Sequence, residues 1–354
     1  MMNKKDQSFF VVLTLYHLIF AAIAWHYSLG ASGDAYHYWH LTKDWKDYFH
    51  IGPDVIGLIN YPFSKILKLP FWVGFVLYSS VGLYAILGLY RFSLQYTNAR
   101  NQMGKYLLLG IFLLPNLHFW TSMIGKEAII FLSISWIIIH YAKREYGSLK
   151  HIAGWLLLAS IRPHVALFLL LAIGMTEIFA GRKWDIKKLA LMGLGVLGAF
   201  GLYLMTLQLL NRNPFNIGYI LERNDTSLIA FKRAESYVPM IEYNWLERIL
   251  ALNFRPFFEK PASLYSLVLS LENVLVVIIL SYAGIIYARK FKTIKLGNFA
   301  KTAIWFFLIS SLFFIQRYSC LGIFVRTKIM YLPFLLITAL QIITQIKSPP
   351  RDQT

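Results

Sequence analysis

The sequence predicts an all-α fold, a polytopic transmembrane helical bundle that forms a single integral membrane domain over residues 1–354. Three observations predict it. Hydrophobic residues make up 57% of the chain and charged residues only 15%, whereas a soluble domain averages roughly a quarter charged. The mean hydropathy is +0.53. Apolar blocks of about 20 residues alternate with short basic clusters, a pattern typical of bilayer spans rather than of a globular core.

The net charge and the cysteine count exclude other classes of protein and site. The chain has 35 Lys and Arg against 17 Asp and Glu, a formal charge of +18. In a soluble protein this charge would suggest nucleic acid, but basic cytosolic loops explain it in a membrane protein, so we expect no nucleic-acid partner. Cys320 is the one cysteine, which excludes an internal disulfide and a cysteine-built metal site.

The apolar blocks predict about ten membrane segments, some of them short or re-entrant, because several fall below the roughly 20 residues of a full crossing. The first segment follows two lysines and is consistent with a cleaved signal peptide or an uncleaved signal anchor; a multispan chain favours the anchor. The segments cover residues 9–27, 71–90, 103–114, 127–141, 151–160, 165–180, 189–210, 266–287, 298–315 and 328–346.

The stretch 151–180 decides the topology, because it is either one long span or a hairpin with Arg162 at its tip. Short loops rich in Lys and Arg stay in the cytosol, and this stretch has basic clusters on both sides, so the hairpin is favoured. Both chain termini are then cytosolic. The outer face receives two long loops, 31–70 and 211–265, and three shorter segments at 115–126, 161–164 and 316–327.

The first outer loop carries the candidate general base. In a helix Asp34 and His37 share a face at i and i+3, and a carboxylate beside an imidazole at a membrane surface can take a proton from a sugar hydroxyl. The alternative is an aspartate that only stabilises a helix start. A divalent metal on Asp34, His37 and His40 is disfavoured because residues i and i+6 point apart, so we expect neither a cofactor nor a metal.

Lys126 comes at the start of an expected helix, where its charge opposes the helix dipole. That placement suits a bound anion, since helix-end amides and an ammonium together bind phosphate. The alternative is a lysine that snorkels to the lipid headgroups with Glu127 as its partner.

The hairpin tip repeats this pattern. Pro163 suits the first position of a helix and keeps Arg162 out of the helix before it. A charge buried near the membrane costs roughly 2.5–3.5 kcal/mol and is functional by default. His164 is a further candidate for proton transfer, or it satisfies a backbone carbonyl.

Three more arginines are expected on the outer face, although positive charge is normally kept from that side. Arginine binds phosphate or carboxylate through two parallel hydrogen bonds. Glu272, inside its apolar segment, is expected to pair with one of them. The three are Arg255, Arg317 and Arg326.

A series of motifs runs in order from about residue 9 to residue 340: Gly33-Asp34-Ala35, Asn116-Leu117-His118-Phe119-Trp120 with Gly125-Lys126-Glu127, Arg162-Pro163-His164, Arg255-Pro256-Phe257 with Glu272-Asn273, and Arg326 ahead of Tyr331-Leu332-Pro333-Phe334. In this series the chain resembles bacterial integral-membrane polysaccharide polymerases of the O-antigen and exopolysaccharide type. Those families are similar in turn to the GT-C glycosyltransferases, in which a carboxylate of the first outer loop acts as base. The loop 211–265 is shorter and less rich in arginine than in many such polymerases.

The resemblance implies a GT-C-like fold and glycosyl transfer from a polyprenyl-diphosphate-linked saccharide, on the outer face of the bacterial cytoplasmic membrane. Membrane lipid and polysaccharide-assembly proteins are the other expected partners. Asp34 would act as base, with His37 and His164 as further catalytic candidates. The expected ligands of the diphosphate are Lys126, Arg162, Arg255, Arg317 and Arg326.

Two other functions compete with this one. A transporter or flippase of lipid-linked saccharides would spread charged residues through midplane cavities and repeat its halves, whereas here the charges gather toward one face and no repeat is seen. A purely structural subunit would not need outer cations at helix starts. Polymerase, ligase and single-sugar transferase are not separated by the sequence.

Overall fold

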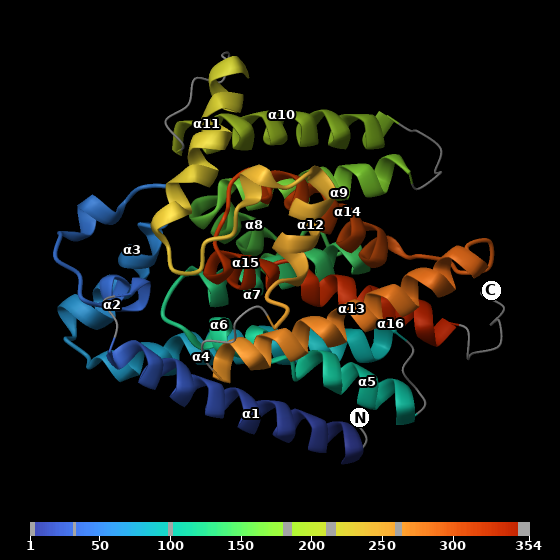
Figure 1. Ribbon diagram of the computed structural model, residues 1–354, viewed down its shortest axis with the longest axis horizontal. Coiled ribbons are helices and arrows are strands. Elements are labelled where there is room, and N and C mark those ends of the chain that lie inside the picture. Colours follow the sequence, from blue (N-terminus) through green and yellow to red (C-terminus); the bar gives the residue numbers. More distant parts are fainter. Residues whose placement is uncertain are drawn as a thin grey trace.

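The computed structural model describes residues 4–30, 33–97, 102–179, 186–209, 217–258 and 264–345 (Figure 1). Regular structure in these ranges is helical, apart from one isolated antiparallel bridge between Tyr237 and Cys320. The predicted all-α class is therefore confirmed.

The helices follow the apolar segments of the sequence, since a continuous helix satisfies its own backbone hydrogen bonds without water. The apolar helices are α1 (Lys4–Leu29), α4 (Phe71–Tyr96), α5 (Gln102–Phe112), α7 (Lys126–Lys143), α8 (Leu149–Ile161), α9 (Pro163–Ile178), α10 (Ile186–Leu209), α13 (Leu264–Lys290), α14 (Asn298–Phe314) and α16 (Leu332–Gln345). Between them lie α2 (Asp34–Trp39), η1 (Trp45–Tyr48), α3 (Val55–Tyr61), the π-helical turn η2 (Pro62–Ile66), α6 (Pro115–Ser122), α11 (Ile217–Ile229), η3 (Ala230–Arg233), η4 (Met240–Glu242), α12 (Trp245–Phe254) and α15 (Leu321–Lys328).

Three helices of the described chain are long and apolar enough to cross a membrane: α1 from Gln7, α4 and α13. The number rises to five if each of two bent pairs counts as one span, namely α6 with α7, bent by 114°, and α15 with α16, bent by 54°. Helices α8, α9, α14 and part of α10 are apolar but shorter. These lengths support a membrane protein, while the total of about ten segments stays a prediction.

Helices α8 and α9 run out and back, with Arg162 at the turn between them. At the turn, Arg162 Nη2 lies 3.3 Å from Glu127 Oε1 at the start of α7. Near the other end of α9, Glu177 accepts a hydrogen bond of 2.6 Å from the hydroxyl of Tyr141, close to the end of α7. The segment therefore forms the predicted hairpin, with its two ends beside the same end of α7.

The packing gives the bundle two ends (Figure 1). At one end, which we call the site end, α1 and α8 end and α4 and α7 begin. Helices α2 and α3 lie at this end, at the left of the figure. At the opposite end, which we call the basic end, α4 and α7 end and α8 begins, and it carries Arg91, Lys143 and Lys150. The 18 residues of α7 separate the two by about 27 Å, close to the roughly 30 Å thickness of a bilayer core.

The two long loops predicted to face outward gather at the site end. The first, 31–70, is described from residue 33 and contains α2 and α3; the second, 211–265, is described from residue 217 to 258. The second loop contacts the end of α14 and the start of α15, where Val238 N donates to Ser319 O at 2.9 Å. Residues 31–32, 211–216 and 259–263 lie outside the described residues, and the side of the membrane stays a prediction.

Helix α7 lies at the centre of the bundle and packs against α4, α8 and α14. Most of its residues are buried, as expected for a helix that is apolar on all sides. Next to it, α6 packs closely on α4, because a Cβ atom on Gly82 would lie 2.2 Å from the carbonyl oxygen of Thr121. This packing fixes the place of the α6–α7 bend at the site end.

The last predicted segment, 328–346, begins four residues later than expected. Helix α15 ends at Lys328, and α16 begins only at Leu332. Lys328 is buried, and its ammonium donates to Arg255 O at 3.0 Å and to Asn273 Oδ1 at 2.7 Å. These partners fix the break, and α15, bent away from α16, carries Arg326 to the site end.

Candidate functional site

The centre of the candidate site is the carboxylate of Glu127, the second residue of α7. Its side chain is 3% exposed. It accepts hydrogen bonds from Arg162 at 3.3 Å, from Arg326 Nε, and from Arg326 Nη2 at 3.0 Å. A buried carboxylate needs such partners, because an unpaired ion out of water is strongly unfavourable. Glu127 therefore joins three elements, α7, the α8–α9 turn and α15.

Asp34, at the start of α2, binds the edge of the Arg326 guanidinium that Glu127 leaves free. Its Oδ2 lies 2.6 Å from Arg326 Nη1, and the Asp34 side chain is 56% exposed. The guanidinium also lies 5.3 Å from the ring centroid of Trp120, a cation–π contact. Arg326 thus bridges one buried and one exposed carboxylate, which only the planar fork of arginine can do with parallel hydrogen bonds.

Lys126 lies next to this group. Its ammonium is 3.3 Å from the hydroxyl of Tyr38 and 5.9 Å from the centroid of its ring. Burial raises the pKa of the Tyr38 hydroxyl well above its usual range, and the negative charges of Asp34 and Glu127 raise it further, so Tyr38 stays neutral. Three cations and two carboxylates make up the group, with a formal net charge of +1. We call it the charge cluster: Asp34, Lys126, Glu127, Arg162 and Arg326.

A cavity of about 220 Å³ opens beside the charge cluster. Asp34, Glu127 and Arg326 line it together with apolar and aromatic side chains. Pockets for whole small-molecule ligands are usually larger, about 300 to 1,000 Å³. The cavity is therefore sized for one polar end of a larger ligand. Its other lining residues are Tyr27, Ser28, Gly33, Ala35, Tyr36, Trp120, Met123 and Ile124.

The structure brings four of the eight predicted site residues into the charge cluster: Asp34, Lys126, Arg162 and Arg326. His37 is exposed, and its ring contacts that of Tyr36 rather than the Asp34 carboxylate, which is turned to Arg326. The expected pairing of Asp34 with His37 is therefore wrong.

The other three predicted site residues have different neighbours. His164 stacks on Phe313 with ring centroids 6.0 Å apart, in an aromatic group of α9 and α14. Arg255 Nη1 donates to the Tyr243 hydroxyl at 2.9 Å. Arg317 Nη1 donates to Ser227 Oγ at 2.6 Å.

Within the described residues, Glu272 does not pair with an arginine as expected. It is buried in α13 and accepts a hydrogen bond of 2.8 Å from the backbone N–H of Asn116, at the start of α6. A carboxylate at a helix start compensates the unsatisfied amides there.

Glu127 is the member of the cluster that sequence reasoning underrated. We expected it only as a partner of Lys126, its neighbour in sequence. Its arginine partners are 35 and 199 residues away in the chain. One signal was available, since an acidic residue at the head of an otherwise apolar helix calls for a cationic partner.

Among the described residues, no group of three or more His, Cys, Asp and Glu side chains could hold a metal ion. The chain matches no family model, and neither a curated protein nor a solved structure matches it.

Proposed function

We propose that the protein is a membrane glycosyltransferase of the polysaccharide-polymerase type that uses a polyprenyl-diphosphate-linked saccharide at the site end. One observation carries the proposal: the exposed carboxylate of Asp34 lies 2.6 Å from Arg326, on the wall of a cavity that Glu127 also lines. A proton acceptor and a cationic anion site thus lie side by side. Sugar transfer from a diphosphate needs both.

In the proposed reaction, the Asp34 carboxylate takes the proton of the acceptor hydroxyl. The hydroxyl oxygen then bonds to the anomeric carbon of the donor, while the bond from that carbon to the diphosphate oxygen breaks and its electron pair leaves with the diphosphate. Arg326, Arg162 and Lys126 stabilise the negative charge that grows on the leaving group.

Arg326 would change partner during this cycle. Without donor, its Nη1 holds Asp34 while Nε and Nη2 hold Glu127. A diphosphate oxygen that takes over Nη1 frees Asp34 for the acceptor hydroxyl, and Glu127 keeps the arginine in place. Glu127 is therefore a positioning residue, since its buried oxygens are already occupied by two arginines.

The size and place of the cavity fit a lipid-linked donor. A volume of about 220 Å³ takes the reacting end, while the saccharide chain extends into the outer aqueous phase and the polyprenyl tail into the bilayer. The outer face of a bacterial cytoplasmic membrane, a GT-C-like fold and about ten membrane segments belong to the same proposal.

The second candidate is a transporter or flippase of lipid-linked saccharides. One observation favours it: Glu272 is buried inside the candidate span α13, and Lys328 is buried close to that span, bonded to Asn273. Buried ionisable groups within spans often mark transport pathways. An assay of the two activities side by side separates the candidates.

Asp34→Asn tests the base. The amide keeps the size of the side chain and an oxygen for Arg326, but it cannot accept the proton. With purified protein in detergent and a lipid-linked oligosaccharide, we expect donor affinity to stay close to that of the unchanged protein while product formation falls by roughly 100-fold or more.

Asp54→Asn is the matched control, because Asp54 is an exposed carboxylate of the same outer segment that lies outside the charge cluster. It should turn over normally. If Asp34→Asn does so too, Asp34 is only a helix-stabilising residue, since asparagine serves at helix starts about as well. Movement of the donor across liposomes without a glycosidic product would instead favour the transporter.

A further inference from the structure

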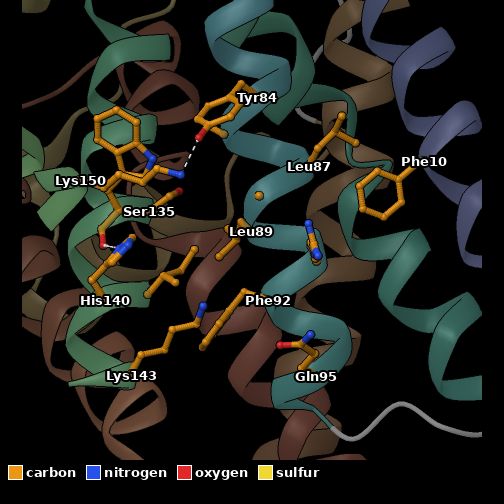
Figure 2. Close-up of a pocket in the computed structure, with 15 residues that line it drawn as sticks. Phe10, Tyr84, Leu87, Leu89, Phe92, Gln95, Ser135, His140, Lys143 and Lys150 are labelled. Carbon is orange, nitrogen blue, oxygen red and sulfur yellow. Dashed lines mark hydrogen bonds between the residues drawn. The ribbon is translucent and has the colours of Figure 1, made fainter. Parts of the chain in front are cut away.

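A second and larger cavity, of about 480 Å³, lies at the basic end of the bundle (Figure 2). It is formed by the second half of α4, the second half of α7, the first turn of α8 and Phe10 of α1. Its lining on α7 begins at Ser135, eight residues and about 12 Å of helical rise beyond Glu127 of the charge cluster. No step of the proposed reaction uses it.

The charged side chains that line this cavity are basic. Arg91, His140, Lys143 and Lys150 line it, and its described lining includes no Asp or Glu. Lys150 donates to the hydroxyl of Tyr84 at 2.9 Å, so its charge has a neutral partner. Figure 2 shows the Lys143 amine extending toward Phe92. His140 is 3.7 Å from Glu145, the one carboxylate paired with this group in the described chain.

A buried hydroxyl on the wall of the cavity also lacks a partner. Ser135 is 1% exposed, and its Oγ makes no hydrogen bond within the described residues. Ser133, two residues earlier on α7, instead donates to the carbonyl of Ile129 at 2.7 Å. A buried hydroxyl without a partner is unfavourable by about 1–3 kcal/mol, so its place on a cation-lined wall points to an anionic acceptor from outside the protein.

Much of the remaining lining is apolar and includes Phe10, Leu87, Leu89, Phe92 and Ile139. Tyr84 and Gln95 are exposed at the rim of the same cavity, so it opens to the surface of the bundle. Cations at a helix end with an apolar wall between helices match the two parts of a phospholipid, a phosphate headgroup and acyl chains. A free phosphate would make no use of the apolar wall.

We infer that this cavity binds an anionic phospholipid of the membrane leaflet at the basic end. The phosphate lies among Arg91, Lys143 and Lys150 and accepts the hydrogen bond of Ser135, and an acyl chain lies along Phe10 and Leu87. The lipid fills the contact between α4, α7 and α8 and holds the basic end at its leaflet. The assignment is independent of the reaction at the site end.

Binding of phosphatidylglycerol to purified, delipidated protein tests the assignment, measured by native mass spectrometry. Diacylglycerol has the same acyl chains without the phosphate, and glycerol 3-phosphate has the phosphate without the chains. We expect phosphatidylglycerol to bind, diacylglycerol to bind more weakly, and glycerol 3-phosphate at equal concentration not to displace the lipid. Displacement would make the ligand a soluble phosphate and overturn the assignment to a lipid.

Two sets of variants locate the binding. Arg91→Gln with Lys143→Gln should weaken phosphatidylglycerol binding by about 30-fold, since each cation near a membrane surface contributes roughly a factor of five. Arg289→Gln with Lys290→Gln removes the same charge from exposed positions at the basic end, outside the cavity, and should change binding less than twofold. Equal losses in the two pairs would overturn the site.

Ser135→Ala separates a ligand role from a structural one. Because the hydroxyl has no partner within the described residues, its removal should leave the melting temperature without lipid unchanged or higher. Binding of phosphatidylglycerol should nonetheless weaken by roughly tenfold, the effect of a lost hydrogen bond to a charged group. Unchanged affinity in this variant would refute the placement of the phosphate.

Discussion

The two ends of the bundle differ in the number of carboxylates placed among their cations. At the site end, Arg162 and Arg326 are committed to the carboxylates of Glu127 and Asp34. At the basic end, Lys150 has a neutral hydroxyl as partner, and the described lining of its cavity includes no carboxylate. The carboxylates fix the positions of the site-end arginines while the charge cluster keeps a formal charge of +1, whereas at the basic end no carboxylate of the described cavity lining competes with an anion from outside.

This difference has an energetic consequence. Burying an ion pair adds little net stability, because desolvation offsets much of the attraction. Removing one member of such a pair is costly, since it leaves an uncompensated charge out of water. The geometry of the site end therefore tolerates few substitutions, whereas the charges at the basic end can be removed with little effect on folding.

The largest expected effect tests whether the two ends face opposite sides of a membrane. On a Cys320→Ser background, Lys46→Cys places a thiol in the site-end segment and Thr293→Cys places one in the turn after α13. A membrane-impermeant maleimide applied to intact cells should label position 46 and leave position 293 unlabelled until the cells are opened. Labelling of position 293 from outside would reverse the predicted sidedness of both cavities.

The second-largest expected effect is a loss of stability at the site end. Glu127→Gln keeps the shape of the side chain but leaves Arg162 and Arg326 without their buried countercharge. We expect a loss of about 3–5 kcal/mol in the free energy of unfolding, or a failure to accumulate in the membrane. Thermal unfolding in detergent measures it. Glu235→Gln, the same change at an exposed position, should shift stability by less than about 0.5 kcal/mol.

A double variant sharpens the result. If Glu127 matters through its pairing with Arg162, then Arg162→Gln added to Glu127→Gln should cost less than the sum of the two single changes. Additive losses would mean that the two residues act separately, contrary to the geometry at 3.3 Å.

The smallest effect is expected at the basic end. Without lipid, Arg91→Gln with Lys143→Gln should change the free energy of unfolding by less than about 0.5 kcal/mol, because both side chains are exposed. A stability loss comparable to that of Glu127→Gln would show that these cations support the fold itself, and the contrast between the two ends would fail.

The helices were predictable from the sequence because hydropathy is a local property. The block 71–90 became α4, from Phe71 to Tyr96, and the block 103–114 became α5. The position of Arg162 at a turn was also predictable, since the following Pro163 ends one helix and starts the next. The later start of the last helix, at Leu332 rather than Lys328, was not predictable, because buried Lys328 is held by Arg255 and Asn273, which lie far away in the chain.

The charge cluster, too, was only partly predictable from the sequence. The sequence by itself determined that the protein is helical and apolar, and it singled out Asp34 as a candidate base and Lys126, Arg162 and Arg326 as cations on a face where positive charge is normally rare. Only the tertiary structure decided that Glu127 would join two arginines and that Asp34 would turn to Arg326 instead of His37. The physical reason is that hydropathy acts along each helix, whereas ion pairing in a low-dielectric interior depends on which helix ends the packing brings within a few ångströms.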